Sequence, residues 1–341
     1  MSATEAATAT ALITGAPHVF ADAGIDQHAA RIAAVIDPAF LAEAGWDPVG
    51  LVLSLPPEHP LLGRPVCRAQ GCLTTACDQS GICACCRRRL AEHGLDEDQI
   101  ALLPARARQR SGRGPDTCVV DGCAREWVSS RSALCRSHLD LAQALRIGTE
   151  DFLAHPLAAP LDACAECAVV ACTRQRRHHD GVYCHAHQQR LHEARRRAPN
   201  LDEQHWRLIE AAVGRGGEVS LRGLPPLVIG EVLVGLQQRC RVNAVKTGDA
   251  VLRALCDDLR RQQVTSLGEY VVAASRGLEF HGLANCLAGH AGRALATPET
   301  EVAKNEWDLV VFGHSGTLSF TGLSQGWLRE AAKRWAADDL P

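Results

Sequence analysis

Most residues that could do chemistry in this chain are cysteines, and they recur in a fixed order. Sixteen cysteines occur among 341 residues, and thirteen of them lie between residues 61 and 200. Twelve Cys and His residues form three quartets with one layout, namely Cys67, Cys72, Cys83, Cys86; Cys118, Cys123, Cys135, His138; and Cys167, Cys172, Cys184, His187. Four residues separate the first two members of each quartet and two separate the last two. Successive quartets begin 51 and 49 residues apart, so the chain contains an internal repeat.

The layout of each quartet fits a tetrahedral zinc ion. The first two ligands suit a chain turn, and the last two, three residues apart, share one face of a helix's first turn. The start of a helix also favours the thiolate form of its cysteine. All four positions are filled by protein, which is typical of structural and not catalytic sites. We expect two to three Zn²⁺ ions per chain.

Some cysteines leave the ligand register open. Cys77, Cys85 and Cys164 are surplus, and Cys72-x4-Cys77 or Cys164-x2-Cys167 could replace the first pair of a module. The C-x2-C pairs could also be redox dithiols. The repeat spacing favours the quartets given above. The remaining cysteines fall on apolar faces of predicted helices, where core thiols are usual; they are Cys240, Cys256 and Cys286.

Composition excludes several classes of protein. The chain is 46% hydrophobic and 22% charged, which are ordinary globular values. No apolar run approaches the length of a membrane helix, and residues 1–10 do not resemble a signal peptide. We therefore expect a cytoplasmic protein without a membrane partner. In that reducing compartment, metal binding explains the cysteines better than disulfides do.

The net charge of −3 hides a basic segment. Residues 61–200 contain twenty arginines and fifteen acidic residues, whereas residues 1–60 contain one arginine and seven acidic residues. Arginine clusters lie on or beside the predicted module helices and are candidate DNA contacts, namely Arg87, Arg88, Arg89, Arg174, Arg176, Arg177, Arg195, Arg196 and Arg197. The same arginines could instead form a solvated face.

The predicted fold is mainly α with small α+β zinc modules: three treble-clef-like zinc fingers and then a helical domain with a possible β-hairpin. We expect a disordered N-terminus over 1–16, and a helical lead-in with a Pro-rich linker over 17–65. Zinc modules 1, 2 and 3 are expected over 66–105, 116–150 and 162–198, and a mainly helical domain over 201–341. In that domain, helices are predicted to open at Pro226, after a cap at Thr247 or Asp249, before Tyr270 and at Pro298, with one that includes Leu283 and a last one after Ser324. Segments 309–312 and 317–321 are predicted to pair as the hairpin.

Several segments together resemble one protein family. The segments Gly45–Pro65, Cys172–Arg177, Gly214–Leu224 and Thr297–Leu309 are similar to the N-terminal region of actinobacterial tyrosine-type site-specific integrases. The likeness covers nearly all of residues 38–341. In that family, this region precedes a core-binding and a catalytic domain, and we expect the present chain to end where the core-binding domain would begin.

The resemblance implies an accessory, DNA-binding role in the recombination of mobile elements, with DNA as a partner and a recombinase or another protein as a further candidate partner. We expect no recombinase active site in this chain, because its two tyrosines, Tyr183 and Tyr270, do not follow the required Arg, Lys and His-x-x-Arg groups. Two alternatives stay open. One is a zinc-finger module for protein interaction or structure; the other is an HNH-type metal-dependent nuclease using His178, His179, Asp180, Asn200 and His205. The target sequence and oligomeric state are not predicted.

Overall fold

The computed structural model describes residues 23–63, 66–72, 74, 76, 80–104, 117–128, 132–242, 248–314, 316–320, 326, 327, 330, 331 and 334. The chain is mostly helical with small sheets, and it divides into two compact units, each made from separated segments. The helical unit comprises the described parts of 1–37, 226–242 and 265–341, and the modular unit comprises those of 38–225 and 243–264.

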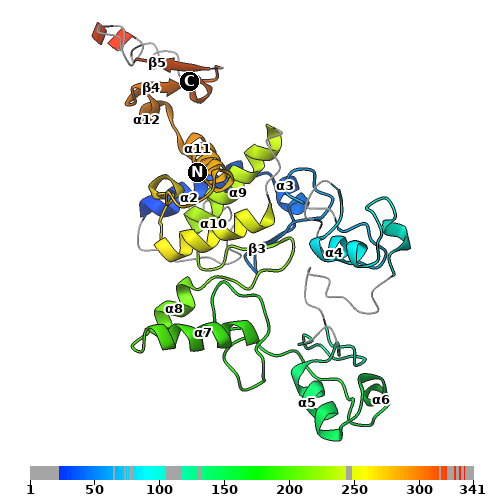
Figure 1. The fold of residues 1–341 in the computed structure, drawn as a ribbon. Coiled ribbons are helices and arrows are strands. Elements are labelled where there is room, and N and C mark those ends of the chain that lie inside the picture. The colour runs from blue at the N-terminus through cyan, green and yellow to red at the C-terminus, as the bar shows by residue number, and fades with distance from the viewer. Residues whose placement is uncertain are drawn as a thin grey trace. The chain divides into compact units, whose positions relative to one another are not determined.

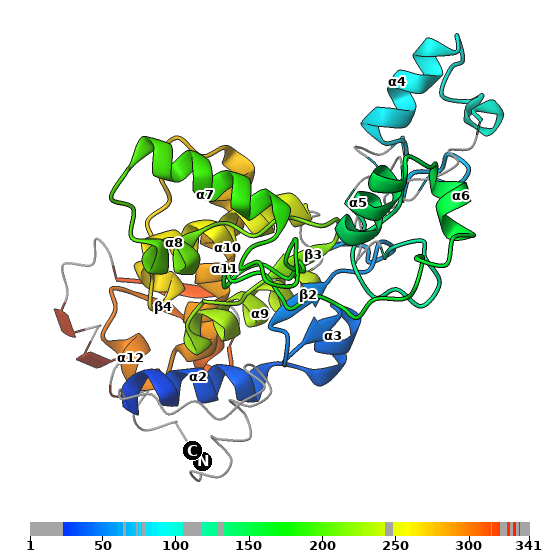
Figure 2. The same ribbon diagram turned by 90° about the horizontal axis from the view of Figure 1, so that it is seen from below.

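Three helices build the core of the helical unit: α2 (Ala23–Val35), α9 (Pro226–Arg241) and α11 (Leu278–Leu295). They pack against one another in both views (Figures 1 and 2). Residues 226–237 of α9 are all buried, and the helix itself carries apolar side chains on every side. Gly235 allows the close approach of α11, since a Cβ there would lie 2.8 Å from Leu287 Cδ2.

Shorter elements complete the helical unit. The 3-10 helix η2 (Leu267–Glu269) is capped by Ser266, and α12 (Pro298–Val302) by a capping box at Thr297. Strand β4 (Glu306–Asp308) pairs antiparallel with β5 (Thr317–Ser319), and the 3-10 helix η3 (Leu309–Phe312) lies between them in sequence. Trp307 is fully buried between the rings of Phe312 and Phe320.

Two predictions for this region were wrong in detail. The hairpin forms, but its first strand is 306–308 rather than 309–312, because the Asp308 side chain caps a turn of 3-10 helix at Val310. The expected helix at Tyr270 stops after one 3-10 turn, and Tyr270 is already extended. The helices expected at Pro226, Asp249, Leu283 and Pro298 are confirmed, and the helix after Ser324 lies largely outside the described residues.

A small antiparallel sheet joins distant parts of the modular unit. Strands β1 (Trp46–Asp47), β2 (Val52–Ser54) and β3 (Glu218–Ser220) lie side by side in that order, with Leu53 opposite Val219. Helix α3 (Pro38–Glu43) precedes β1, and α10 (Asp249–Gln262) packs against β3. The buried Asp249 carboxylate accepts hydrogen bonds from the Gly217 amide at 2.8 Å and from Arg253 at 2.7 Å, so α10 holds the approach to β3.

The second ligand pair of each quartet lies at the start of a helix. Helix α4 (Ala84–Glu92) and the 3-10 helix η1 (Ile100–Leu102) belong to module 1, and α5 (Arg136–Leu145) and α6 (Thr149–Leu153) belong to module 2. Module 3 has α7 (His185–Arg197), and α8 (Glu203–Ile209) follows beside it in both views (Figures 1 and 2). The helices expected after the second ligand pairs are therefore present.

The compact units do not follow the order of the expected domains. Helix α2 belongs with α9 and α11 rather than with a lead-in to module 1, and α10 belongs with the modules rather than with the helical domain expected over 201–341. The apolar face of α2, formed by Ala29, Ile32 and Ala33, is buried. No helix among the described residues is long and apolar enough to cross a membrane.

Candidate metal centres

The three predicted quartets come together as three separate clusters. Within each, one ligand atom per residue lies within 4.8 Å of every other, and all twelve residues are buried. The clusters are those predicted: Cys67, Cys72, Cys83, Cys86; Cys118, Cys123, Cys135, His138; and Cys167, Cys172, Cys184, His187. Four convergent, buried, soft donors form the ligand set that zinc prefers in structural sites. Each tetrad is suited to bind one Zn²⁺ ion.

The first ligand pair of every module sits on the same tight turn. The amide of the first cysteine donates to the carbonyl seven residues later, as from Cys118 to Arg125 at 2.7 Å and from Cys167 to Arg174 at 2.8 Å. The amide of the second cysteine donates back across three residues, as from Cys123 to Val120 at 3.1 Å. Backbone hydrogen bonds therefore close this turn in each module.

The second ligand pair sits at the start of a helix. Cys83, Cys135 and Cys184 are the N-cap residues of α4, α5 and α7. The amide of each donates to the first cysteine of its own module at 3.3 Å, as Cys184 does to Cys167 Sγ. Backbone N–H groups and the helix dipole both stabilise thiolate charge. Burial nevertheless raises the pKa of Cys83, and the Cys118 side chain raises that of Cys135, so these contacts offset only part of the cost of ionising the ligands.

The two histidine ligands are held in one orientation by their second ring nitrogen. His138 Nδ1 lies 3.3 Å from Cys118 Sγ, and His187 Nδ1 lies 3.3 Å from Cys167 Sγ. On the other side of each ring, Nε2 is 2.9 Å from a backbone carbonyl, that of Ala159 or Ala211. A proton on Nε2 leaves Nδ1 as the metal-binding atom. Both acceptors are backbone atoms 21 and 24 residues downstream, so side-chain patterns did not reveal them.

The ligands strongly perturb one another's protonation. A hydrogen bond from Cys135, stronger than the opposing burial, lowers the pKa of Cys118 to about 4. Burial and the neighbouring thiols raise the pKa of Cys86. At His187, burial opposes the charged form, but hydrogen bonds with Cys167 and Cys184 outweigh it and raise the pKa to about 10. Zinc binding has to displace the protons that these groups share.

Each metal cluster also forms part of a small hydrophobic core. In module 2 the buried Phe152 of α6 packs against the His138 ring, with ring centroids 5.6 Å apart. In module 3 the buried Trp206 of α8 lies edge-on to His187 at 6.1 Å. The segment after each of these modules thus covers its metal site, which extends module 3 beyond its predicted end at 198. Sequence analysis missed this role of Trp206.

The register of the ligands follows the repeat. Neither Cys85, half-buried in α4, nor the buried Cys164 belongs to a cluster, and Cys77 lies outside the described residues. Cys164 lies instead beside a cavity between modules 2 and 3. Cys256 is fully buried in α10, as expected of a core thiol, whereas Cys240 and Cys286 are only partly buried.

The candidate DNA-binding arginines lie on the modules and differ in their surroundings. Arg88, Arg195 and Arg197 have side chains that are 71%, 57% and 82% exposed, and their ion partners are Glu92, Glu203 and Glu193. Arg196 is also exposed on α7. Exposed ion pairs of this kind contribute at most about 1 kcal/mol. A phosphate could therefore replace Glu92 or Glu193 at little cost, whereas Glu203 is mostly covered and also pairs with Arg207 and Tyr183.

The other candidate arginines are more enclosed. Arg87 binds Glu97 at 3.0 Å and Ser80 at 3.0 Å, and Arg89 donates to the Pro104 carbonyl. Three half-buried arginines, Arg174, Arg176 and Arg177, line the cavity between modules 2 and 3. Sequence analysis missed Arg125 and Arg136 of the same cavity, although they occupy the repeat positions of Arg174 and His185.

The residues considered for nuclease or recombinase chemistry are not among the metal-ligand clusters of the described residues. His178, His179, Asp180 and His205 belong to none of the metal-ligand clusters found in the described part of the chain. Tyr183 is buried in module 3, where its hydroxyl donates to Glu203 and accepts a hydrogen bond from Arg207 Nε at 2.6 Å. Burial raises the pKa of Tyr183. No family model matches this chain, and no curated protein or solved structure matches it either.

Proposed function

We propose that this chain is a zinc-stabilised DNA-binding protein in which three treble-clef-like modules present arginines to the phosphate backbone. The observation that carries the proposal is the combination of closed metal sites with exposed arginines on the helices that follow them. All four ligand positions in each site come from protein, so no position is left for a water or substrate. The metal serves folding, and the chemistry offered to a partner is that of the guanidinium groups.

The arginines of α7 give this proposal its clearest surface. Arg195, Arg196 and Arg197 occupy the last turn of the helix, clear of every ligand in module 3. Guanidinium groups bind phosphate oxygens in a forked geometry, and adjacent arginines can follow a phosphate backbone without reading bases. We therefore propose contacts that are largely independent of DNA sequence.

The role that we propose is accessory to site-specific recombination. The support is the sequence resemblance to integrase N-terminal regions, together with the absence of a suitably placed nucleophilic tyrosine. We expect no strand cleavage and no covalent protein–DNA adduct from this chain, assayed on supercoiled DNA with Mg²⁺ or Mn²⁺. An adduct that disappears in Tyr183→Phe or Tyr270→Phe would overturn this part of the proposal.

The salt dependence of DNA binding tests the main proposal. Fluorescence anisotropy with a labelled duplex should give a log–log slope of about −0.9 per phosphate contacted. Replacing Arg195, Arg196 and Arg197 together by alanine should weaken binding on all sequences and make the slope shallower, with zinc content unchanged. The matched control replaces the same three by lysine, which keeps the charge. If the parent chain shows no salt-sensitive binding to any duplex, the protein-interaction alternative replaces this proposal.

A further inference from the structure

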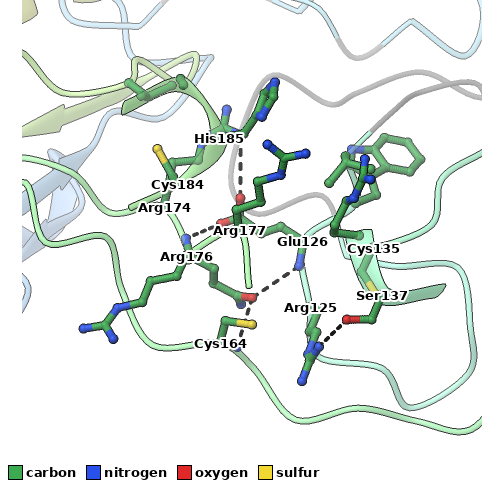
Figure 3. A pocket seen from close by; sticks show the side chains of 16 residues that line it. Arg125, Glu126, Cys135, Ser137, Cys164, Arg174, Arg176, Arg177, Cys184 and His185 are labelled. Atoms are coloured by element: carbon green, nitrogen blue, oxygen red, sulfur yellow. Dashed lines mark hydrogen bonds and ion pairs between the residues drawn. The ribbon is translucent and has the colours of Figure 1, made fainter. Parts of the chain in front are cut away.

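A cavity of about 200 Å³ lies between modules 2 and 3, within the modular unit (Figure 3). Most of its wall comes from equivalent positions of the two repeats, 49 residues apart. The pairs that matter here are Arg125 with Arg174, Glu126 with Gln175, and Arg136 with His185. The cavity is therefore formed by two copies of one structural motif that face each other.

Reciprocal hydrogen bonds hold the two halves of this wall together. The Glu126 amide donates to Gln175 Oε1 at 3.3 Å, and the Gln175 amide donates to Glu126 Oε1 at 3.3 Å. Gln175 Nε2 also donates to the Ala124 carbonyl at 3.0 Å. Glu126 and Gln175 occupy equivalent positions of the two repeats, so each module binds the other through the same type of contact. These contacts fix the cavity wall.

Positive charge dominates the cavity wall. Five arginines line it, whereas Glu126 is the one carboxylate among its lining residues. That carboxylate is shared, since Arg174 lies 3.6 Å from it and Arg215 also pairs with it. Arg136 pairs with Asp140 at 2.7 Å, so the other three wall arginines, Arg125, Arg176 and Arg177, carry the uncompensated charge.

Three of the five arginines donate to neutral groups in the hydrogen bonds that the structure shows. Arg125 donates to Ser137 Oγ at 2.7 Å, as seen in Figure 3, and to the Asp162 carbonyl at 2.9 Å. Arg176 Nε donates to the Glu166 carbonyl at 2.9 Å, and Arg177 reaches Gln188 Oε1 at 3.5 Å. Their charges attract an anion without first having to release a carboxylate.

Two further groups of donors face the same space. Helices α5 and α7 both begin at this wall, where Cys135, Arg136 and Ser137 mirror Cys184, His185 and Ala186. Helix N-termini carry partial positive charge, although the amides of Cys135 and Cys184 themselves donate to metal-site thiols. In addition, Arg174 Nε is buried and has no hydrogen-bond partner among the described residues. A buried donor of this kind is costly unless a bound group supplies an acceptor.

We infer that this cavity between modules 2 and 3 binds a phosphate group. Its volume is below the usual range of about 300–1,000 Å³ for small-molecule pockets, which favours a single oxyanion over a whole nucleotide. The inference rests on the proposed function insofar as the phosphate belongs to the DNA backbone. A free phosphate compound shares the same chemistry, and the experiment below separates the two sources.

The test compares two cavity arginines with an arginine outside the cavity. Arg136→Gln/Arg177→Gln removes two charges from the wall. The control is Arg146→Gln, because Arg146 is exposed and ends the helix that Arg136 begins, about 15 Å away along the axis. Each zinc-loaded full chain is unfolded thermally in inorganic phosphate or in chloride at equal ionic strength, and its duplex affinity is measured by anisotropy. Elemental analysis confirms three zinc ions per chain.

We expect phosphate to raise the unfolding midpoint of the parent and of Arg146→Gln, and not that of the double variant. Duplex affinity should fall at least about tenfold in the double variant. A phosphate response without duplex binding would leave the cavity as a site for free phosphate and overturn the DNA proposal. If the double variant still binds the duplex, and phosphate does not raise the unfolding midpoint of the parent, the cavity inference alone is overturned. If the double variant loses zinc, Arg177→Gln alone carries the test, because the hydrogen bond that the described residues give its guanidinium is a long one of 3.5 Å to Gln188.

Discussion

At the scale of single residues, the metal ligands are fixed by backbone geometry as much as by their own chemistry. The turn that carries Cys118 is closed by main-chain hydrogen bonds, and the Cys135 amide donates to Cys118 Sγ; both arrangements recur in all three modules. Histidine replaces cysteine as the last ligand only in modules 2 and 3, where a downstream carbonyl orients the ring. Each histidine ligand is thus paired with a backbone acceptor on the side of the ring away from the metal site.

Loss of one ligand should cost one zinc ion. Cys135→Ala removes a buried donor from module 2, and the remaining three cannot close a tetrahedral shell. We expect about two zinc ions per chain by elemental analysis, against three in the parent. Cys286→Ala is the matched control, because Cys286 is a half-buried thiol outside every cluster. Equal zinc in the two variants would contradict the assignment of module 2.

The histidine ligands should tolerate cysteine better than alanine. His187→Cys keeps a donor at the position where module 1, whose ligands are all cysteines, already uses a thiol, whereas His187→Ala leaves the site open. We expect three zinc ions in the first variant and about two in the second. The cysteine variant should still be less stable than the parent, because it loses the 2.9 Å contact with the Ala211 carbonyl and the packing on Trp206. Zinc content and urea unfolding together distinguish the two effects.

At the scale of elements, a glycine sets the distance between the two longest helices. Gly235→Ala would place a methyl group 2.8 Å from Leu287 Cδ2 and 3.0 Å from its Cα, so α9 and α11 would have to separate. We expect a loss of about 1–3 kcal/mol in the free energy of unfolding. In contrast, Gly289→Ala on α11 meets no atom within 4 Å and should be neutral or stabilising. Similar urea midpoints for both variants would show that the helices are not in close contact.

A buried carboxylate on α9 should make the helical unit sensitive to pH. Glu231 accepts hydrogen bonds from Ser266 Oγ and from the Leu267 amide, both at 2.6 Å, and burial raises its pKa. As pH rises through the ordinary glutamate range, the unfolded chain loses its proton first, so stability falls until the folded state ionises too. Unfolding measured between pH 4 and 7 should show this slope. Glu231→Gln should reduce this dependence of stability on pH. Glu279→Gln, at an exposed residue of α11, should leave it unchanged.

Sequence patterns predicted elements well where a single local rule decides them. The proline at 226 and the apolar residues that follow it predicted α9, and the three ligand quartets emerged from spacing alone. The hairpin was misplaced because Leu309–Phe312 is apolar enough for a strand, but the Asp308 side chain caps a 3-10 turn there. The role of Trp206 and the pairing of Glu126 with Gln175 could not be predicted, since both depend on contacts between segments distant in sequence.

At the scale of the whole molecule, metal content and helix packing belong to different units. None of the twelve ligands lies in the helical unit, and the described core of that unit is hydrophobic. Chelation of zinc should therefore unfold the modules and leave α2, α9 and α11 folded. Far-UV circular dichroism should retain helical signal after chelation, and hydrogen exchange should locate the protected amides in these three helices. Protection lost equally in both units would contradict this prediction.

The discontinuous path of the helical unit has a consequence for synthesis on the ribosome. Helix α2 ends at Val35, and its main partner α9 begins at Pro226. At about 5–20 residues per second, the ribosome needs roughly 10–40 s to make the intervening chain. During that time the apolar face of α2 has no partner helix, while modules 2 and 3 can fold once the segments that carry Ala159 and Ala211 have emerged and zinc is present. Limiting zinc during translation should therefore prolong the interval in which the nascent chain exposes apolar surface to chaperones.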